Sequence, residues 1–544
     1  MMKKRLLTLI FLVLIFIPRM SWSQDKVAES VFAHVSKNIA AAGEKVWFSI
    51  QALDQNLNFY SKIGYAELVD RNGLAVYQVI YPLQNGKYEG ILEIPNSLES
   101  DHYLLRFYTR ISPVLSEKGV FNQFITIINP KKPSKVKATI QNGKSYGFIK
   151  AEEISPKNQT SLSLKSKTSI DFPSSFDGKV SSISVSISNP FLPETHHGYI
   201  RREIYRDIQD NSDLIPEPYG HIVYGKNLNT MIDTTETFFL SSHGVQSFLS
   251  SAKPKPSGDL YFEIGALKAF NYLIAQSSHI ENQLNFSPEL PFLKLKFKED
   301  FIFPVLQMEE KDRELLTDLI TSGQVSNYYY SNDSVEFAPI VVGFDADKTY
   351  LLDDYTRFEN LETTLREYVP EVLVRKQDKK TLFKVLNNPL GSVFQENPLI
   401  MIDAMPVFDT DALAAFDPVN IQKLEVMTRE FSFNRDKYSG VLSFTSFNND
   451  FGKFQLPPNA LYLNYPEIQK VKTPKSPHLN SNLSQENFPD FRSTLYWNAT
   501  ANGITSPLEI NSSEISGNFE IILGYQDGDG NMKFMKKPLK VVNR

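Results

Sequence analysis

Two adjacent histidines with a nearby acid are the first candidates for chemistry in this sequence. His196 and His197 follow Glu194, and imidazole and carboxylate groups are common zinc ligands. On a strand, however, adjacent side chains point to opposite faces, so the two imidazoles would not share one ion easily. None of the eight histidines makes the H-E-x-x-H pattern. We therefore favour a polar loop after Pro193 over a metal site.

Two acidic stretches are weaker candidates for a cation site. The Asp527–Asn531 run begins like a calcium loop, but Met532 stands where glycine is needed and Pro538 where a bidentate Glu should be. An ordinary hairpin turn is the better interpretation. A second acidic set could collect a cation, although Asp-rich turns before a helix are common; its members are Asp345, Asp347, Asp353 and Asp354.

Patterns for phosphate binding and nucleophilic catalysis fail. Gly143-Lys144-Ser145 ends like a phosphate loop, but Ala138 replaces the upstream glycine and no apolar strand precedes it. The sequence has no G-x-S-x-G elbow and no G-x-G-x-x-G. Tyr328, Tyr329 and Tyr330 could stack on sugars, although a β-edge or core role is favoured. We assign no catalytic, cofactor-binding or metal-binding residue and expect no enzyme activity.

The composition indicates which elements must position any site. The chain has 544 residues, which corresponds to about three to five domains. The 39 Phe, 25 Tyr, 25 Gly and 31 Pro residues favour strands and turns over helical bundles. The absence of cysteine excludes disulfides, thiolate metal sites, a cysteine nucleophile and a thioester. We expect a mainly β protein.

The first 23 residues have the pattern of a signal peptide. Lys3, Lys4 and Arg5 precede the apolar run Leu6–Ile17, and small residues precede Gln24. Cleavage would leave 53 cationic against 62 acidic side chains, a net charge of −9. We expect an exported chain that binds no nucleic acid, because such binding needs clustered Lys and Arg. We also expect no lipid anchor and no transmembrane segment in the mature chain.

Residues 24–130 predict a β-sandwich. Segments 44–50, 63–69 and 75–80 alternate or carry β-formers, and a turn at 70–73 joins the last two. Through Ala42–Phe48, Tyr65–Asp70 and His102–Thr109, this stretch resembles the second domain of the α2-macroglobulin type found in Gram-negative envelope proteins. The resemblance implies a spacer or interaction module.

Three further β units are expected. Residues 131–200 predict a second sandwich, in which the strand 180–188 alternates so that one face is buried and its Ser face is wet. Residues 201–295 more weakly resemble the prealbumin-like fold of carboxypeptidase regulatory domains, through 220–225 and 257–262. Through the phrase at 488–498, residues 476–544 resemble the C-terminal sandwich of the same envelope proteins, and they close with a hairpin. A type IX secretion sorting signal is the alternative for that hairpin.

Two helices are predicted in the remaining segment, 296–475. The first covers 308–321, with Gly323 just beyond its end. The second covers 361–369, with Asn360 as N-cap, Glu362 and Arg366 as an i,i+4 pair, and Pro370 as its stop.

The second helix opens a stretch, about 360–450, that contains four motifs: 365–374, 398–407, 416–428 and 438–446. In these motifs and their order, the stretch resembles the plug domain of TonB-dependent outer-membrane receptors. Ala404 departs from the glycine usual after the Asp of the turn, and no TonB box is evident near Gln24. Only 94 residues follow Asp450, so we expect a small α+β plug-like domain without its own barrel.

The sequence thus predicts tandem immunoglobulin- or macroglobulin-like sandwiches plus an α+β plug-like domain. The resemblances imply a non-enzymatic envelope protein, associated with the outer membrane on its periplasmic or surface side. Its plug-like domain would dock with a β-barrel partner in transport, secretion or outer-membrane protein assembly. The alternative is an exported glycan- or ligand-binding protein.

Overall fold

The structure is a computed structural model of the whole chain. It describes residues 28–54, 60–136, 144, 146–154, 160–170, 179–208, 215–244, 246–265, 270–278, 284–326, 329, 339–434, 436–469, 489–499 and 507–542. The expected signal peptide, 1–23, lies outside these residues, as do Gly143, Ser145, Tyr328 and Tyr330.

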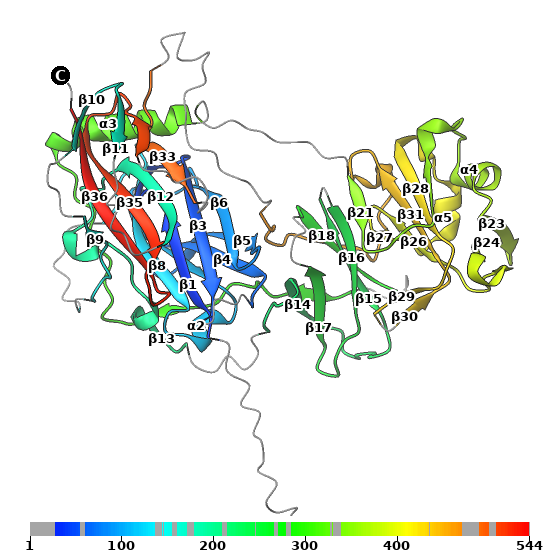
Figure 1. The fold of residues 1–544 in the computed structure, drawn as a ribbon. Helices are drawn as coiled ribbons and strands as arrows, with labels where there is room; N and C mark the ends of the chain where they lie inside the picture. Colours follow the sequence, from blue (N-terminus) through cyan, green and yellow to red (C-terminus); the bar gives the residue numbers. More distant parts are fainter. Residues whose placement is uncertain are drawn as a thin grey trace, which may run out of the picture.

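The chain is mainly β, as predicted, and its sheets form two lobes (Figure 1). Lobe 1 contains the described residues up to 206, a helix at 313–325 and the described parts of 489–542. Lobe 2 contains the described parts of 215–278 and 339–463. No helix among the described residues is both long and apolar enough to cross a membrane.

The first part of lobe 1 is a two-sheet sandwich. Its sheets enclose an apolar core that includes Phe48, Phe107 and Phe121, all fully buried. The predicted turn at 70–73 is present, since the Gly73 N–H donates to the Asp70 carbonyl at 3.0 Å. One sheet has the strand order β1 (Ser30–Val35), β3 (Lys45–Leu53) and β6 (Lys87–Glu93). The other has the order β2 (Ile39–Ala41), β8 (Val120–Ile128), β7 (Asp101–Tyr108), β4 (Ile63–Val69) and β5 (Ala75–Pro82). The short helix α2 (Ser112–Leu115) follows β7.

The second part of lobe 1 combines strands from both ends of the chain. The sequence predicted separate sandwiches at 131–200 and 476–544, and the structure corrects this, because their strands hydrogen-bond within one sheet. The predicted closing hairpin is present as β35 and β36. The sheet order is β10 (Thr160–Ser163), β36 (Met532–Val542), β35 (Gly517–Gln526), β12 (Lys179–Ile187) and β33 (Thr494–Asn498), with β9 (Glu152–Glu153) on β36 and the pair β11 (Lys167–Ile170) and β34 (Leu508–Asn511) beside it.

The serine face of β12 is buried, so the prediction that it is wet is wrong. Ser182, Ser184 and Ser186 are at most 2% exposed. The β35/β36 sheet packs on the outer face of β1 and β3, where Trp497 contacts Trp47 with ring centroids 6.3 Å apart. Alternation in a strand indicates two chemically different faces, but a second layer of protein can replace water on the polar one.

The first predicted helix is shifted and packs in lobe 1. Helix α3 covers Arg313–Val325 after a 3-10 turn at Glu310–Asp312, whereas 308–321 was predicted within the plug-like unit. Leu319 is fully buried in the core of the β35/β36 sheet. Gly323 lies inside this helix and not beyond its end. A Cβ at this position would approach the Ala41 Cβ to 2.8 Å. The glycine allows a close helix–strand contact and does not end the helix.

Lobe 2 begins with two sheets between 221 and 288. The unit predicted at 201–295 is not self-contained, because β21 and β32 from the predicted plug-like range form the two edges of its larger sheet. The smaller sheet has the order β17 (Asp259–Gly265), β14 (His221–Asn227) and β19 (Phe286–Pro288). The larger sheet has the order β21 (Ile340–Val342), β16 (Gln246–Ala252), β15 (Phe238–His243), β18 (Tyr272–Ser277) and β32 (Leu461–Leu463). A separate pair consists of β13 (Tyr205–Arg206) and β20 (Lys296–Phe297).

A mixed five-stranded sheet forms the far end of lobe 2 (Figure 1). Its apolar core includes Leu365, Leu413 and Phe444, so the short helices pack on this sheet. The strand order of this sheet is β22 (Lys348–Leu351), β28 (Ile421–Met427), β31 (Val441–Ser446), β26 (Leu399–Ile402) and β27 (Met405–Pro406). The two helices are α4 (Leu361–Tyr368) and α5 (Thr410–Ala415). A smaller antiparallel sheet consists of β23 (Val372–Gln377), β24 (Lys380–Asn387) and β25 (Ser392–Val393), and a hairpin consists of β29 (Phe431–Phe433) and β30 (Asp436–Tyr438).

The local predictions for this end of the chain are confirmed. Asn360 caps α4 by accepting the Thr363 N–H at 2.8 Å, and Glu362 pairs with Arg366 at 2.9 Å. Ala404 sits in the β26–β27 turn at φ +66°, a left-handed conformation that glycine adopts more readily. The turn therefore keeps a backbone geometry suited to glycine while carrying alanine.

A buried polar network joins the two lobes. The Glu217 carboxylate accepts from the Tyr65 hydroxyl at 2.7 Å and pairs with the Arg110 guanidinium at 3.1 Å. His221 Nδ1 lies 2.8 Å from Glu217, and its Nε2 lies 2.9 Å from the Tyr465 hydroxyl. Burial alone would raise the pKa of Glu217, but Arg110 and His221 bring it below its usual value. The network thus ties β4 to β14 with a charged carboxylate at its centre.

Candidate functional site

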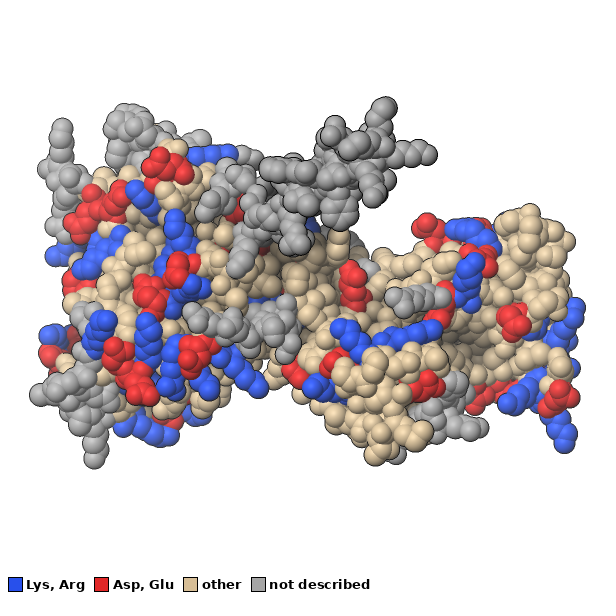
Figure 2. All heavy atoms as spheres, turned by 90° about the horizontal axis from the view of Figure 1, so that it is seen from below, with Lys and Arg blue, Asp and Glu red and all other residues tan. Residues whose placement is uncertain are grey.

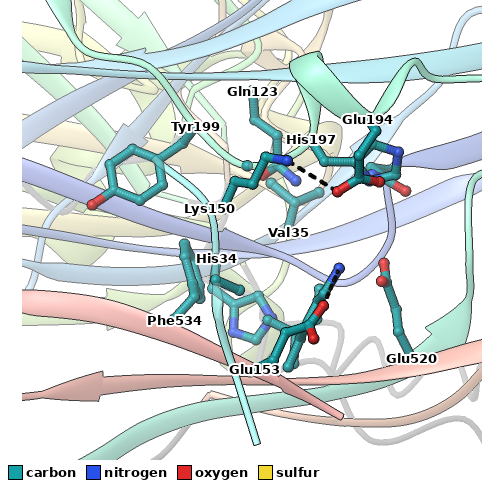
Figure 3. Close-up of a pocket in the computed structure, with 15 residues that line it drawn as sticks. His34, Val35, Gln123, Lys150, Glu153, Glu194, His197, Tyr199, Glu520 and Phe534 are labelled. Carbon is teal, nitrogen blue, oxygen red and sulfur yellow. Dashed lines mark hydrogen bonds and ion pairs between the residues drawn. The ribbon is translucent and has the colours of Figure 1, made fainter. Parts of the chain in front are cut away.

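A cavity of about 280 Å³ lies in lobe 1 where four segments of the chain meet (Figure 3). The first sandwich contributes His34 and Val35 from β1 and Gln123 from β8. The opposite wall comes from β35 and β36. The two remaining sides are the 149–154 segment and the loop at 194–199. Its volume is near the lower end for small-molecule sites, ~300–1,000 Å³.

Backbone hydrogen bonds hold the 149–154 segment over the cavity. The Ile149 N–H donates to the Tyr199 carbonyl at 2.7 Å, and the Ile154 N–H donates to the Lys536 carbonyl at 2.9 Å. Gly198 makes the close approach to Ile149 feasible, since it has φ +100° and a Cβ there would lie 2.2 Å from the Ile149 oxygen. A glycine is thus needed where this segment crosses the loop.

Two ion pairs lie at the edge of the cavity. Lys150 pairs with Glu194 at 3.1 Å, and Lys536 pairs with Glu153 at 3.6 Å. Three of these four side chains are more than half exposed, so the pairs are hydrated and contribute little to stability. The hydrogen bond from Lys150 lowers the pKa of Glu194. Both lysines are therefore already paired with carboxylates.

Glu520 is the remaining acid of the cavity. It points into the space in Figure 3, and it makes no hydrogen bond or ion pair with any residue that the structure describes. Burial raises the pKa of Glu520 to about 7, and Glu194 adds to this while Lys536 opposes it. The carboxyl group therefore changes charge near neutral pH and is available to a ligand.

The apolar side of the cavity is formed by Tyr199, Phe534, Val35 and Ile522. Tyr199 is fixed by stacking on Phe121, with ring centroids 4.8 Å apart. His34 is also committed, because its ring nitrogens lie 2.7 and 2.9 Å from the Ser182 and Ser184 hydroxyls. Burial lowers the pKa of His34 to about 3, so this imidazole is neutral near pH 7.

The histidine pair of the sequence is divided between two environments. The His196 ring packs on Phe124 and Phe148, at centroid distances of 5.6 and 5.4 Å. His197 Nε2 lies 2.9 Å from the Leu192 carbonyl and borders the cavity. Among the residues that the structure describes, no three histidine or acidic side chains gather closely enough to hold a metal ion.

The acidic stretches have other local partners. Asp347 accepts from the Thr428 N–H at 2.7 Å, and Asp353 pairs with Arg357 at 2.5 Å. They lie beyond opposite ends of β22, so they do not converge. Asp527 accepts the Asn531 N–H at 2.8 Å, which lowers the pKa of Asp527 and closes the β35–β36 hairpin turn.

The remaining candidates also take part in local contacts. The Lys144 N–H donates to the Asp300 carbonyl at 3.1 Å, while its predicted neighbours Gly143 and Ser145 lie outside the described residues. Tyr329 is 3% exposed, and its hydroxyl donates to the Pro489 carbonyl at 2.8 Å. Of the tyrosine triplet, this residue has the core role that the sequence favoured.

Sequence reasoning missed Glu520, although a signal was present. In Phe519–Leu523, Phe519, Ile521 and Leu523 share the buried face, which puts Glu520 and Ile522 together on the other face. An isoleucine beside a glutamate on that face was a sign that it was covered by other parts of the chain. Nothing in the sequence, however, indicated that β1 and the 149–154 segment would provide that cover.

A second candidate site is an apolar surface at one end of the lobe 2 sheet. Val419 is 52% exposed and Phe447 is 38% exposed. Asn420 connects them, since it follows Val419 and its carbonyl accepts the Phe447 N–H at 3.2 Å. The Arg357 guanidinium lies 5.7 Å from the Phe447 ring centroid. We call Val419 and Phe447 the apolar end. On the face drawn in Figure 2, by comparison, acidic and basic side chains are interspersed over both lobes.

Comparisons with known proteins give weak similarities. The chain matches no protein-family profile and no curated protein. It is weakly similar in structure to bacterial α2-macroglobulins: that of Salmonella reacted with methylamine (8% identity, TM-score 0.21, covering 95% of this chain and 39% of that one) and that of Escherichia coli in its native conformation (8%, 0.20, 95% and 40%). Dimeric latent PorU from Porphyromonas gingivalis has 9% sequence identity and a TM-score of 0.14, and the match covers 95% of this chain and 34% of that one. The chain spans about two fifths of the macroglobulins' length, and TM-scores this low carry no functional argument.

Proposed function

We propose that this chain is a non-enzymatic cell-envelope interaction protein whose plug-like segment docks with an outer-membrane β-barrel partner. The partner would act in transport, secretion or outer-membrane protein assembly. The protein would then be associated with the outer membrane through that contact. The observation that carries the proposal is the order of the plug-like motifs together with the elements that they form.

The four motifs correspond, in chain order, to elements that share one core, with β24, β25, α5 and the β29/β30 hairpin between them. Helix α4 and β23 come from the first motif, β26 and β27 from the second, β28 from the third and β31 from the fourth. All six of these strands and helices contribute to the buried cluster around Leu365, Ile402 and Phe444. A plug-like body of this kind can be presented to a partner as a unit, with the sandwiches as spacers.

The apolar end supplies a surface for that contact. Phe447 with the Arg357 guanidinium beside its ring is the combination of an aromatic side chain and Arg that is enriched at the centre of protein interfaces, and Val419 in the 3-10 turn before β28 adds exposed apolar area. We expect the rim of the barrel or its bound segments to cover Val419 and Phe447.

Affinity purification of the tagged full-length chain from detergent-solubilised outer membranes of its native host tests the proposal. The wild-type chain should recover a β-barrel protein, and a Val419→Glu/Phe447→Glu double variant should lose it. Leu74→Glu is the matched control, because Leu74 is 63% exposed on the distant first sandwich. Recovery of no barrel protein, or equal recovery with the double variant, would contradict the proposal.

A second candidate function is the binding of a small ligand in the lobe 1 cavity. It is supported by the cavity of about 280 Å³ and by the Glu520 carboxylate without a partner among the described residues. Docking and ligand binding use different lobes, so the two functions are separable by mutation.

A further inference from the structure

The lobe 1 cavity offers a carboxylate that has no partner among the described residues. Glu520 points into the space, and its oxygens make no hydrogen bond or ion pair with those residues. Acceptors in partly buried sites are normally satisfied by protein groups or water. A ligand that brings donors can pair with this carboxylate.

The charges of the cavity select the sign of the ligand. Lys150 and Lys536 are engaged with Glu194 and Glu153, so among the described lining residues the Glu520 carboxylate is left without an ion-pair partner. An anion entering the cavity would approach Glu520 and would have to displace a carboxylate from a lysine. A cation would pair with Glu520 without disturbing either ion pair.

The walls of the cavity select the rest of the ligand. Tyr199, Phe534 and Ile522 form an apolar surface beside the acceptors. About 280 Å³ holds one small molecule or one long side chain, but not a folded segment. Ammonium and guanidinium groups carry donors and no acceptors, so they match a cavity with unused acceptors.

We propose that the lobe 1 cavity binds a primary amine or guanidinium on a short apolar stem, with Glu520 as its counter-ion. The proposal deepens the ligand-binding function suggested above and is independent of docking by the plug-like segment. Two sources share this chemistry: a free small amine, and a Lys or Arg side chain of an extended peptide.

Isothermal titration of the full-length chain at pH 8 with defined probes tests the inference. Phenethylamine and butylguanidine should bind, whereas the neutral 2-phenylethanol and the anionic phenylacetate should bind at least tenfold more weakly. Acetylated, amidated Gly-Lys-Gly and Gly-Arg-Gly, compared with Gly-Ala-Gly, distinguish a peptide side chain from a free amine. Equal binding of the amine and the alcohol would overturn the proposal.

Glu520→Gln keeps the shape of the side chain and removes its charge, and it should weaken amine binding at least tenfold. Glu509→Gln, an exposed acid of β34 in the same lobe, is the matched control and should bind as the wild type does. An unchanged affinity in Glu520→Gln would overturn the assignment. Loss of amine binding with unchanged recovery of a barrel partner would show that the two functions are separate.

Amine affinity should also fall at least threefold between pH 8 and pH 5.5. Burial raises the pKa of Glu520 to about 7, so its carboxylate is mostly protonated at the lower pH. The other titratable or charged groups that face the cavity are His34, Lys150, Glu153, Glu194, His197, Tyr199 and Lys536. The Glu520→Gln variant should show a much smaller change, and an equal pH dependence in this variant would count against Glu520 as the counter-ion.

Discussion

The two lobes bury charge in different ways. Lobe 1 contains ion pairs whose partners are both almost fully buried, Lys37–Glu44 and Arg106–Glu67. Lys37 also donates to the Ser493 hydroxyl at 2.8 Å, which joins the first sandwich to a strand near the C-terminus. In the described part of lobe 2, apart from Glu217 and His221 at the junction, the ion-paired side chains are at least 16% exposed.

This difference indicates what each lobe needs in order to fold. Lobe 1 depends on polar contacts between segments that are hundreds of residues apart. The far end of lobe 2 depends on apolar packing and on caps within about 100 residues of sequence. Buried ion pairs are costly to break because the remaining charge has no solvent. Substitutions of charged residues should therefore have large effects in lobe 1 and at the junction, and small ones in lobe 2.

The largest effect is expected for Arg110→Ala at the junction. It would leave the Glu217 carboxylate buried with its hydrogen bonds but without its cation. We expect a loss of about 3–5 kcal/mol in the free energy of unfolding, measured by urea denaturation. Arg366→Ala, which removes an exposed pair on α4, is the matched control and should cost below about 0.5 kcal/mol. Equal losses would show that the lobes do not differ in this respect.

A second, pH-dependent effect is expected for Glu520→Gln. The pKa of Glu520 is raised to about 7 from 4.5, so between these values the folded chain holds a proton that the unfolded chain has lost. Stability of the wild type therefore falls as pH rises through this window, and the full cost is present above pH 7. The variant should be more stable than the wild type by about 1–3 kcal/mol at pH 8, and about equal at pH 4.5. Thermal unfolding at both pH values measures this, and a pH-independent difference would contradict it.

A third effect is expected for Gly198→Ala beside the cavity. The new Cβ would collide with the Ile149 carbonyl, and the φ of +100° is unfavourable for alanine. We expect a loss of about 1–3 kcal/mol and weaker amine binding, because the 149–154 segment must move. Gly391→Ala in lobe 2, at φ +58° with nothing within 4 Å of the Cβ, should cost only about 1 kcal/mol and leave amine binding unchanged. A milder effect at Gly198 than at Gly391 would refute this account of the crossing.

The smallest effect is expected for Asn360→Ala at the start of α4. The substitution removes the side-chain oxygen that accepts the Thr363 N–H. We expect a loss of about 1 kcal/mol in urea denaturation. Asn360→Ser should retain most of the stability, since serine is also a good N-cap. A loss as large as that of Arg110→Ala would mean that lobe 2 depends on more than local capping and packing.

The same contrast explains which features could be predicted from the sequence. Helix α4, its cap and the strands after it were predicted because capping residues, periodicity and Pro370 act over a few positions. The shared sheet of β12, β33, β35 and β36 was not predicted, because no local pattern specifies which distant strands pair. The same holds for the cavity, whose His34, Glu194 and Glu520 come together only through that pairing. Gly323 illustrates the limit, since its sequence position suggested a helix end and its contact with Ala41 required a glycine.

The central claim, that the apolar end docks with an outer-membrane β-barrel, is tested most directly by photo-crosslinking in cells of the native host. A photoreactive phenylalanine analogue replaces Phe447 in the full-length chain, and a second variant carries it at Leu74 in lobe 1. We predict an adduct with a β-barrel protein from position 447 and none from position 74. The absence of a barrel adduct at 447, or equal adducts at both positions, would contradict the account.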